Sequence, residues 1–93
     1  MSKGVNIKSC GRDAGCDMVV EHPTVSRLHA HIELAGDGLL SLQDAGSNNG
    51  MFLKRNDSWI RARRVTLCIG DRIRFGDIEV PLERLTAVFG KRA

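Results

Sequence analysis

Three stretches of the 93-residue sequence carry side chains that bind anions well. They are Gly11-Arg12, Ser26-Arg27 and Asn48-Asn49-Gly50, and each stretch is set among turn-forming residues. Arginine pairs with carboxylate or phosphate through parallel hydrogen bonds, and a serine hydroxyl or an asparagine amide adds further donors. None of the three stretches supplies a general base, a set of metal ligands or an activated nucleophile. These residue types therefore predict recognition of an anion, not catalysis.

The second of these stretches precedes a segment with a clear strand pattern. Residues 28–34 alternate between apolar and polar side chains, a period of two that predicts a half-buried strand. His29 falls on the polar side of this alternation, so we expect it on the outer face. Ser26 and Arg27 then lie where the preceding loop enters the strand, a position in which both side chains can meet an anion.

The spacing of turn-forming residues along the chain is typical of an all-β protein. No segment shows a sustained helical period, and turn signals recur about every 6 to 12 residues, which predicts a β-sandwich of about ten short strands. We expect residues 1–93 to form one domain with a core over about residues 5–83. For residues 84–93 the pattern leaves open a closing strand or a short helix, followed by a tail. A sandwich gathers the loops of one end, so distant residues can line one surface.

Composition and cysteine usage exclude several classes of function. The chain has 42% hydrophobic and 27% charged residues, as a globular protein does, and no apolar run approaches the roughly 20 residues that span a bilayer. Residues 1–10 lack the apolar region of a signal peptide, so we expect a cytoplasmic protein without membrane contact. The spacing of Cys10, Cys16 and Cys68 matches no metal motif, and we expect free thiols, no metal and no cofactor.

Positive charge is concentrated in the second half of the chain. Residues 1–46 carry four Lys/Arg against six Asp/Glu, whereas residues 47–93 carry ten against five. The run Arg61-Ala62-Arg63-Arg64 supports one alternative function, a nucleic-acid-binding domain, because clustered arginines release counterions from a phosphate backbone. The scarcity of aromatic residues disfavours this alternative and favours a solvated face. A second alternative is a protein-interaction domain that binds its partner without a phosphate.

Four short motifs, taken in order, resemble the signature of forkhead-associated domains. They are Gly11-Arg12, Ser26-x-x-His29, Asn49-Gly50 and Gly70-Asp71-Arg72-Ile73. Each motif alone is weak, but together they cover most of the chain, from about residue 5 to residue 82. The resemblance implies a β-sandwich of about eleven strands whose apical loops bind phosphothreonine in partner proteins. It also implies a non-catalytic role in signalling or scaffolding.

The resemblance further implies roles for five ligand-binding residues. Arg12 would pair with the phosphate, and Ser26 would donate its hydroxyl to a phosphate oxygen. Arg27 would contact the phosphate or the peptide backbone beside it. Asn48 would donate its side-chain amide to the phosphate, and Asn49 would hydrogen-bond the peptide main chain and hold it extended.

Three more residues of the signature look like supports of the site. By the same resemblance, Gly11 and Gly50 provide loop geometry, and His29 provides a hydrogen bond that braces the binding loops. Met51 departs from the family pattern, because threonine is common at this position. The core of the signature is unaffected by this departure.

Overall fold

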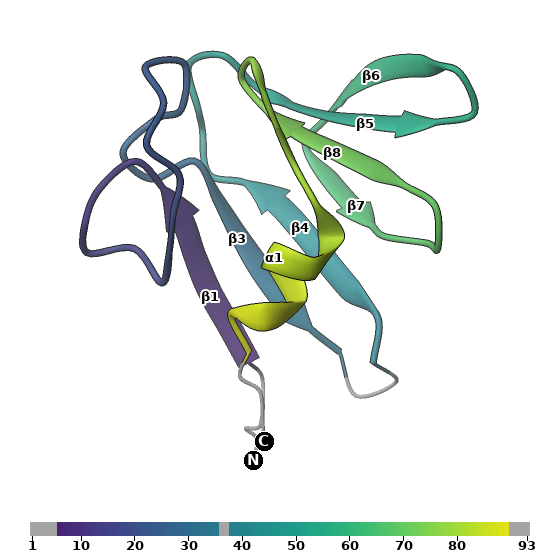
Figure 1. Ribbon diagram of the computed structural model, residues 1–93, viewed down its shortest axis with the longest axis horizontal. Coiled ribbons are helices and arrows are strands. Elements are labelled where there is room, and N and C mark those ends of the chain that lie inside the picture. The colour runs from purple at the N-terminus through teal and green to yellow at the C-terminus, as the bar shows by residue number, and fades with distance from the viewer. Residues whose placement is uncertain (1–5, 36–37, 90–93) are drawn as a thin grey trace.

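The computed structural model describes residues 6–35 and 38–89, which form two β-sheets and a short helix near the C-terminus (Figure 1). The five-stranded sheet has the order β2-β1-β3-β4-β7, and the four-stranded sheet has the order β6-β5-β8-β9. The elements are β1 Asn6–Gly11, β2 Met18–Val19, β3 Ala30–Leu34, β4 Leu40–Asp44, β5 Met51–Arg55, β6 Ser58–Ala62, β7 Arg64–Thr66, β8 Arg72–Phe75, β9 Ile78–Val80 and α1 Leu82–Ala87. The predicted all-β sandwich is confirmed, with nine strands in the described part of the chain where ten or eleven were expected.

The C-terminal segment, for which strand and helix were both open, contains a helix. Pro81 precedes α1 with a φ of −68°, and a proline is tolerated here because the first turn of a helix leaves its N–H groups unbonded. Leu85 of this helix is completely buried, so the core extends beyond the boundary predicted at residue 83. The predicted tail at 90–93 lies outside the described residues. Within the described ranges, no helix is long and apolar enough to cross a membrane.

The strand predicted over residues 28–34 begins later and faces differently at its start. β3 begins at Ala30, Leu28 is 42% exposed, and His29 is fully buried, the reverse of the predicted inner and outer faces for these two residues. The cause is a local bend before the strand, in which the Ser26 N–H donates to His29 Nδ1 at 3.1 Å. Alternation between the two faces therefore starts only at Ala30.

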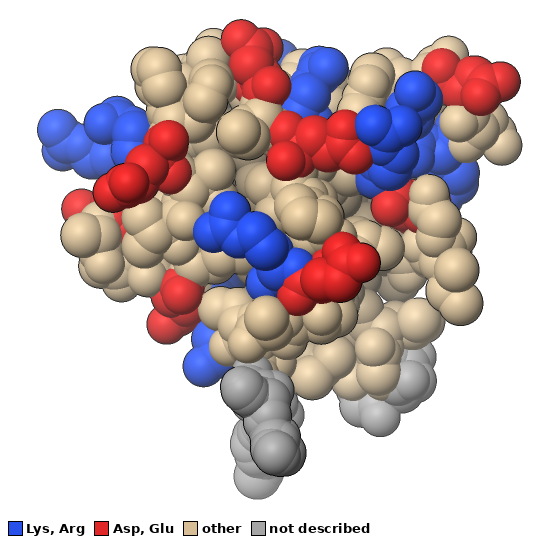
Figure 2. Space-filling model, viewed as in Figure 1, with Lys and Arg blue, Asp and Glu red and all other residues tan. Residues whose placement is uncertain are grey.

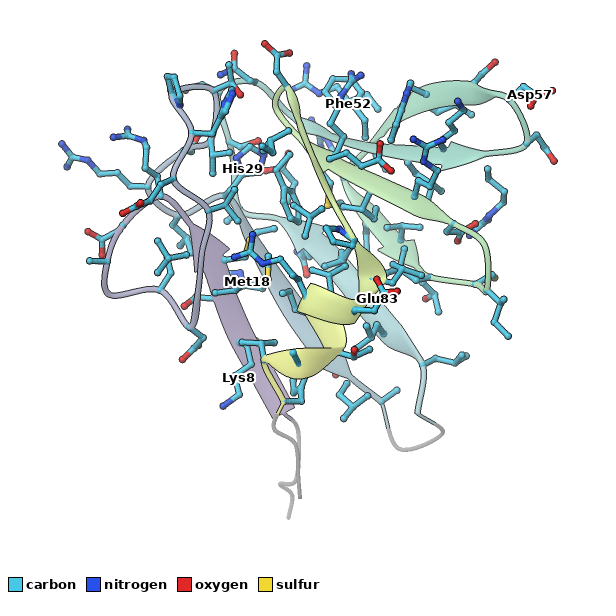
Figure 3. All side chains as sticks on the ribbon, in the orientation of Figure 1. Lys8, Met18, His29, Phe52, Asp57 and Glu83 are labelled. Atoms are coloured by element: carbon cyan, nitrogen blue, oxygen red, sulfur yellow. The ribbon has the colours of Figure 1, made fainter. Side chains whose placement is uncertain are left out.

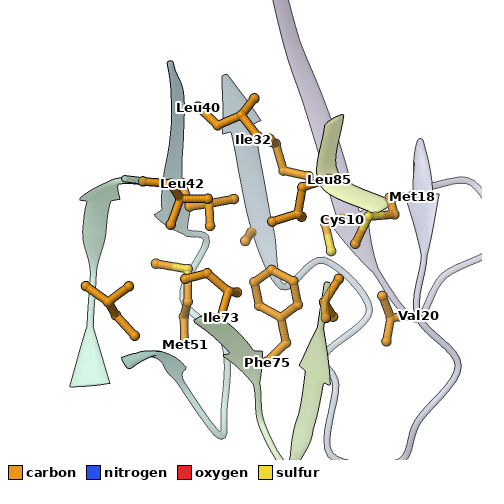
Figure 4. Packing of buried hydrophobic residues seen from close by; sticks show 14 of the residues in the cluster. Cys10, Met18, Val20, Ile32, Leu40, Leu42, Met51, Ile73, Phe75 and Leu85 are labelled. Carbon is orange, nitrogen blue, oxygen red and sulfur yellow. The ribbon is translucent and has the colours of Figure 1, made fainter. Parts of the chain in front are cut away.

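The core lies between the two sheets and is built by alternation within each strand (Figure 4). Ile32 and Leu42 are paired neighbours on the inner face of one sheet, and Ile73 and Phe75 belong to the other; all four are fully buried. Cys10 is buried with them, and this burial raises the pKa of its thiol to about 12. All three cysteines are free, as expected.

Within the described ranges the chain crosses between the sheets three times, and the first two of these crossings lie side by side. Residues 45–50 connect β4 to β5, while Arg63 connects β6 to β7. The crossings are held together because Met51 pairs with Ala62, and Gln43 pairs with Arg64. In addition, the Asp44 N–H donates to the Arg63 carbonyl at 2.7 Å. The arginine-rich run thus lies beside the loop that carries Asn48 and Asn49.

An ion pair ties the end of β5 to the turn before β8. Arg55 donates to both carboxylate oxygens of Asp71, at 3.0 and 2.7 Å, and the Cys68 N–H donates to the same carboxylate at 2.7 Å. The hydrogen bond from Arg55 lowers the pKa of Asp71 below its ordinary value, because it stabilises the charged form. This stabilisation is present above the unfolded-state pKa of about 3.9 and is lost as the pH falls through the lower, folded-state pKa.

We expect Asp71→Asn to lower the free energy of unfolding at pH 7, with the difference from the wild type shrinking as the pH falls below about 4. Urea unfolding at a series of pH values measures this difference directly. Asp57→Asn is the matched control, because Asp57 is exposed in the β5–β6 turn and should change little. A deficit in Asp71→Asn that stays constant between pH 7 and pH 2 would contradict the assignment.

Candidate functional site

Four connections gather at one end of the sandwich, at the upper left of Figure 1. They are the β1–β2 loop, the β2–β3 loop, the β4–β5 loop and the β8–β9 turn. Hydrogen bonds link the other three connections to the β2–β3 loop. The structure therefore brings together the three sequence stretches predicted to bind an anion.

Backbone hydrogen bonds join the first two loops. The Arg12 N–H donates to the Ser26 carbonyl at 2.9 Å, and the Asp13 N–H donates to the Arg27 carbonyl at 3.2 Å. The approach is so close that a Cβ at Gly11 would overlap the Arg27 carbonyl oxygen. Only glycine allows these two backbone segments to come so close. This explains why residue 11, before Arg12, is a glycine.

The guanidinium of Arg12 is anchored at one atom and open at the rest. Its Nε donates to the carbonyl of Val25 at 2.9 Å, and Val25 is itself buried in the core. A guanidinium has five N–H donors, so this bond leaves the four N–H groups of the two Nη atoms. Because the residue is exposed, these donors are available to an anion in solution.

The hydroxyl of Ser26 links the second loop to the third. Ser26 Oγ accepts a hydrogen bond from the Asn48 N–H at 3.1 Å. A serine hydroxyl both donates and accepts, so with this acceptor role filled the O–H hydrogen remains to be donated. The side chain is half-buried, and an oxygen atom outside the loops can receive that hydrogen.

His29 connects the same two loops from below, where it lies among buried side chains (Figure 3). Its Nδ1 accepts from the Ser26 N–H at 3.1 Å, so the ring hydrogen is on Nε2, which donates to the Gly50 carbonyl at 2.8 Å. The ring centroid lies 5.2 Å from that of Phe75. One buried imidazole thus fixes both loops to each other and to the core.

Asn49 ties the third loop to the second at another point. Its Nδ2 donates to the Thr24 carbonyl at 2.8 Å, and Thr24 Oγ1 accepts from the Asp77 N–H of the β8–β9 turn at 2.9 Å. The exposed amide keeps one N–H and its oxygen for other partners. A donor and an acceptor on one side chain are what an extended peptide backbone requires.

The β4–β5 loop is shaped by a turn built on Asp44. The Asp44 carboxylate accepts from the Gly46 N–H at 3.0 Å, the Ser47 N–H at 2.8 Å and the Ser47 hydroxyl at 3.0 Å. Ser47 Oγ in turn accepts from the Gly50 N–H at 3.0 Å, and Gly50 has a φ of 86°. The loop is therefore fixed before any ligand arrives.

The remaining two predicted residues are exposed and less constrained. The side chain of Arg27 lines a shallow hollow beside Asp13 and Cys16 of the β1–β2 loop. Asn48 uses its backbone N–H on Ser26, and its side chain has no partner among the described residues. Arg27 is therefore at the margin of the loop cluster, whereas Asn48 is within it.

Several supporting residues of the site are missing from the sequence prediction. Thr24, Val25, Asp44 and Ser47 each accept hydrogen bonds that hold the loops. Asp44 followed by glycine and serine is the pattern of a side-chain-to-backbone turn, so that part of the support had a readable signal. Asn49 and Arg12 donate to the main-chain carbonyls of Thr24 and Val25, and residue type does not reveal such acceptors.

The groups that the site leaves open are mainly hydrogen-bond donors. The carboxylates of Asp13 and Asp44 are engaged with backbone amides; Asp13 accepts from the Gly15 N–H at 3.0 Å. Among residues 6–35 and 38–89, no group of three His, Cys, Asp or Glu could hold a metal ion. The open donors of Arg12, Ser26 and Asn49 suit an anion attached to an extended chain.

Comparison with known proteins adds an independent line of evidence. A model of the FHA domain matches residues 8–76. Human kanadaptin is 34% identical over 87 residues, which is 80% of this chain and 11% of kanadaptin. The chain therefore spans a small part of the curated relative that it matches.

Two solved structures are similar in both fold and sequence. EmbR of Mycobacterium tuberculosis, in complex with a low-affinity phosphopeptide, has a TM-score of 0.64 and 34% identity over 78% of this chain and 18% of EmbR. The N-terminal FHA domain of Rad53p from S. cerevisiae, in complex with a phosphothreonine peptide, has a TM-score of 0.61 and 29% identity over 78% of this chain and 59% of that one.

Proposed function

The chain belongs to the forkhead-associated domain family, and on that premise we propose that it binds phosphothreonine in partner proteins through the loops around Arg12, Ser26 and Asn49. FHA domains bind phosphopeptides, and two of the similar structures hold such peptides. The proposed role is recognition of a phosphorylated partner without catalysis.

One observation carries this proposal. Three loops that are far apart in the sequence are joined by hydrogen bonds at one surface, and each leaves at least one polar side chain with unused donors there. A phosphate has three strong acceptor oxygens and a charge of about −1.5 to −2 at neutral pH. Donors that are already positioned bind such a group without a large ordering cost.

Each residue has a specific part in the proposed complex. The two Nη atoms of Arg12 pair with phosphate oxygens, and Ser26 donates its hydroxyl to another oxygen. Asn48 donates its side-chain amide to the phosphate, while Asn49 uses its free amide atoms on the peptide main chain. Arg27, at the margin of the cluster, contacts the phosphate or the adjacent backbone.

A titration of paired peptides tests the proposal. We expect the domain to bind phosphothreonine peptides from a degenerate library and to bind the same sequences without phosphate at least about tenfold more weakly, since each charge-assisted hydrogen bond contributes about 1.5–3 kcal/mol. Fluorescence anisotropy with labelled peptides measures both affinities. Equal affinity for the two forms would reject the proposal and would favour the phosphate-independent alternative.

A further inference from the structure

Three arginines beside the proposed site have side chains without partners. Within the described ranges, Arg61, Arg63 and Arg64 form no side-chain hydrogen bond, ion pair or aromatic contact. All three are exposed. Unpaired guanidinium groups that are held close together repel one another, so such a cluster is unfavourable unless an anion binds it.

The other basic cluster of this part of the molecule is already neutralised or stacked. Arg72 forms an ion pair with Glu79 at 2.6 Å, and Arg74 lies 4.3 Å from the ring centroid of Phe52 and 4.9 Å from that of Trp59. Figure 2 shows basic side chains gathered over β5, β6 and β8 with acidic side chains next to them. Arg72 and Arg74 thus have partners, whereas Arg61, Arg63 and Arg64 have none among the described residues.

The three arginines line one hollow at the paired sheet crossings, which we call the arginine hollow. Its lining consists of Arg61, Arg63 and Arg64 together with Gln43, Asp44, Gly46 and Ser47. The backbone of each arginine is fixed, because Arg61 pairs with Phe52 in β5, Arg64 pairs with Gln43 in β4, and the Arg63 carbonyl accepts from the Asp44 N–H. The hollow is therefore a built surface with a defined shape.

The arginine hollow adjoins the proposed phosphothreonine site. The guanidinium of Arg61 lies against Gly50, where a Cβ would come within 2.7 Å of its Nε. Gly50 is the residue whose carbonyl accepts from His29 and whose N–H donates to Ser47. Ser47 lines the hollow, and its neighbour Asn48 belongs to the proposed site. One short loop thus has the site on one side and the hollow on the other.

The single carboxylate in the arginine hollow does not neutralise the three arginines. Asp44 is bound by the two backbone N–H groups and the hydroxyl described above, and it forms no ion pair with an arginine. Three positive charges therefore face one negative charge. The hollow has an excess of positive charge that an anionic group on a ligand can complement.

We propose that Arg61, Arg63 and Arg64 form a second anion subsite, which selects phosphothreonine ligands that carry a further phosphate or carboxylate on one side of the phosphothreonine. This inference rests on the proposed function and adds a determinant of ligand choice to it. The subsite is one-sided because the arginine hollow lies on only one side of the loop 47–50. A long, acidic flanking segment would reach it while the phosphothreonine occupies the loops.

A peptide scan tests the subsite. In a phosphothreonine peptide with an otherwise neutral sequence, glutamate or phosphoserine is placed in turn at each position from four before to four after the phosphothreonine. We expect affinity to rise about two- to fivefold for positions on one side only, with phosphoserine exceeding glutamate, as partly exposed ion pairs of up to about 1 kcal/mol imply. The measured quantity is the ratio of the acidic to the neutral peptide's affinity.

The variant Arg63→Gln/Arg64→Gln tests whether these arginines cause the preference for acidic peptides. It removes two charges and leaves the Arg61 contact with Gly50 intact. This variant should lose most of the preference while it retains affinity for the neutral phosphothreonine peptide. Lys8→Gln/Lys54→Gln is the control of equal charge change, and it should retain the preference. If the wild type does not prefer acidic peptides, or if both double variants show the same preference, the inference is overturned. Binding of phosphothreonine itself would be unaffected by either result.

Two other outcomes separate this inference from its alternatives. If no phosphothreonine peptide binds at all, the proposed function fails and the subsite fails with it. If a duplex oligonucleotide binds more tightly than any peptide, and Arg63→Gln/Arg64→Gln abolishes that binding without changing the peptide ratio, the hollow is a nucleic-acid surface and the inference is overturned.

Discussion

Replacing Arg12 with alanine should weaken binding of a phosphothreonine peptide by about ten- to one-hundredfold, because hydrogen bonds to charged groups contribute about 1.5–3 kcal/mol. The substitution removes the two Nη atoms, which no other part of the described protein uses, and also the bond from Nε to the Val25 carbonyl. Because the residue is exposed, the substitution should lower peptide affinity much more than it lowers the free energy of unfolding. Calorimetric titration of one peptide into both proteins measures the effect.

The variant Arg12→Lys separates charge from geometry at the same position. Lysine keeps the positive charge but has no planar fork and no Nε to reach the Val25 carbonyl. We therefore expect an affinity between those of the wild type and Arg12→Ala. Lys8→Ala serves as the control for loss of one positive charge elsewhere on the domain, and it should bind normally. Full affinity in Arg12→Ala would remove Arg12 from the proposed site.

The types of the site residues could be predicted from the sequence, but the hydrogen bonds that join Arg12, Ser26 and Asn49 to neighbouring loops could not. Arg12, Ser26 and Asn49 stand in turn-rich stretches, and their donors identify them as candidates for anion binding. Their convergence depends on backbone approaches, such as the one at Gly11, which a residue pattern indicates only through a glycine. That Ser26 Oγ accepts from the Asn48 N–H, and so keeps its hydrogen for a ligand, is a property of the folded loops.

The misplacement of the strand start shows why a short-range pattern can mislead. Alternation from residue 28 put His29 outside, yet the side chain is buried because two backbone groups, at Ser26 and Gly50, need a partner inside the fold. Burial of a polar ring is acceptable when both nitrogens are bonded. The pattern held from Ala30 onward, where the ladder hydrogen bonds of the sheet fix the alternation.

The same limit applies to the arginine-rich run. In the sequence it resembles a solvated face, because few aromatic residues accompany the arginines. The structure places Arg63 at a crossing between sheets and Arg61 against Gly50. Those positions follow from strand register between segments far apart in the chain, such as the pairing of Met51 with Ala62. A sequence pattern without known register does not contain this information.

His29 gives the second prediction with a large expected effect. We expect His29→Ala to lower the free energy of unfolding by about 2–4 kcal/mol, from two unpaired backbone groups and a cavity in the core. For a domain of this size, that corresponds to a fall in melting temperature of at least about 10 °C. Thermal unfolding followed by circular dichroism measures it. The variant should also bind phosphothreonine peptides more weakly at a temperature where it is folded, because the Ser26 and Gly50 loops lose their common brace.

His31→Ala is the control for this change, since it removes the same side chain two residues further along the chain. His31 is exposed on β3, so its replacement should change the free energy of unfolding by less than about 0.5 kcal/mol. If the melting temperature of His29→Ala were close to that of His31→Ala, the buried imidazole would not be the support of the loops. If His29→Ala were unstable but bound peptide normally when folded, the brace would serve the core alone, and the loops would hold their arrangement through Gly11, Asn49 and the Asp44 turn.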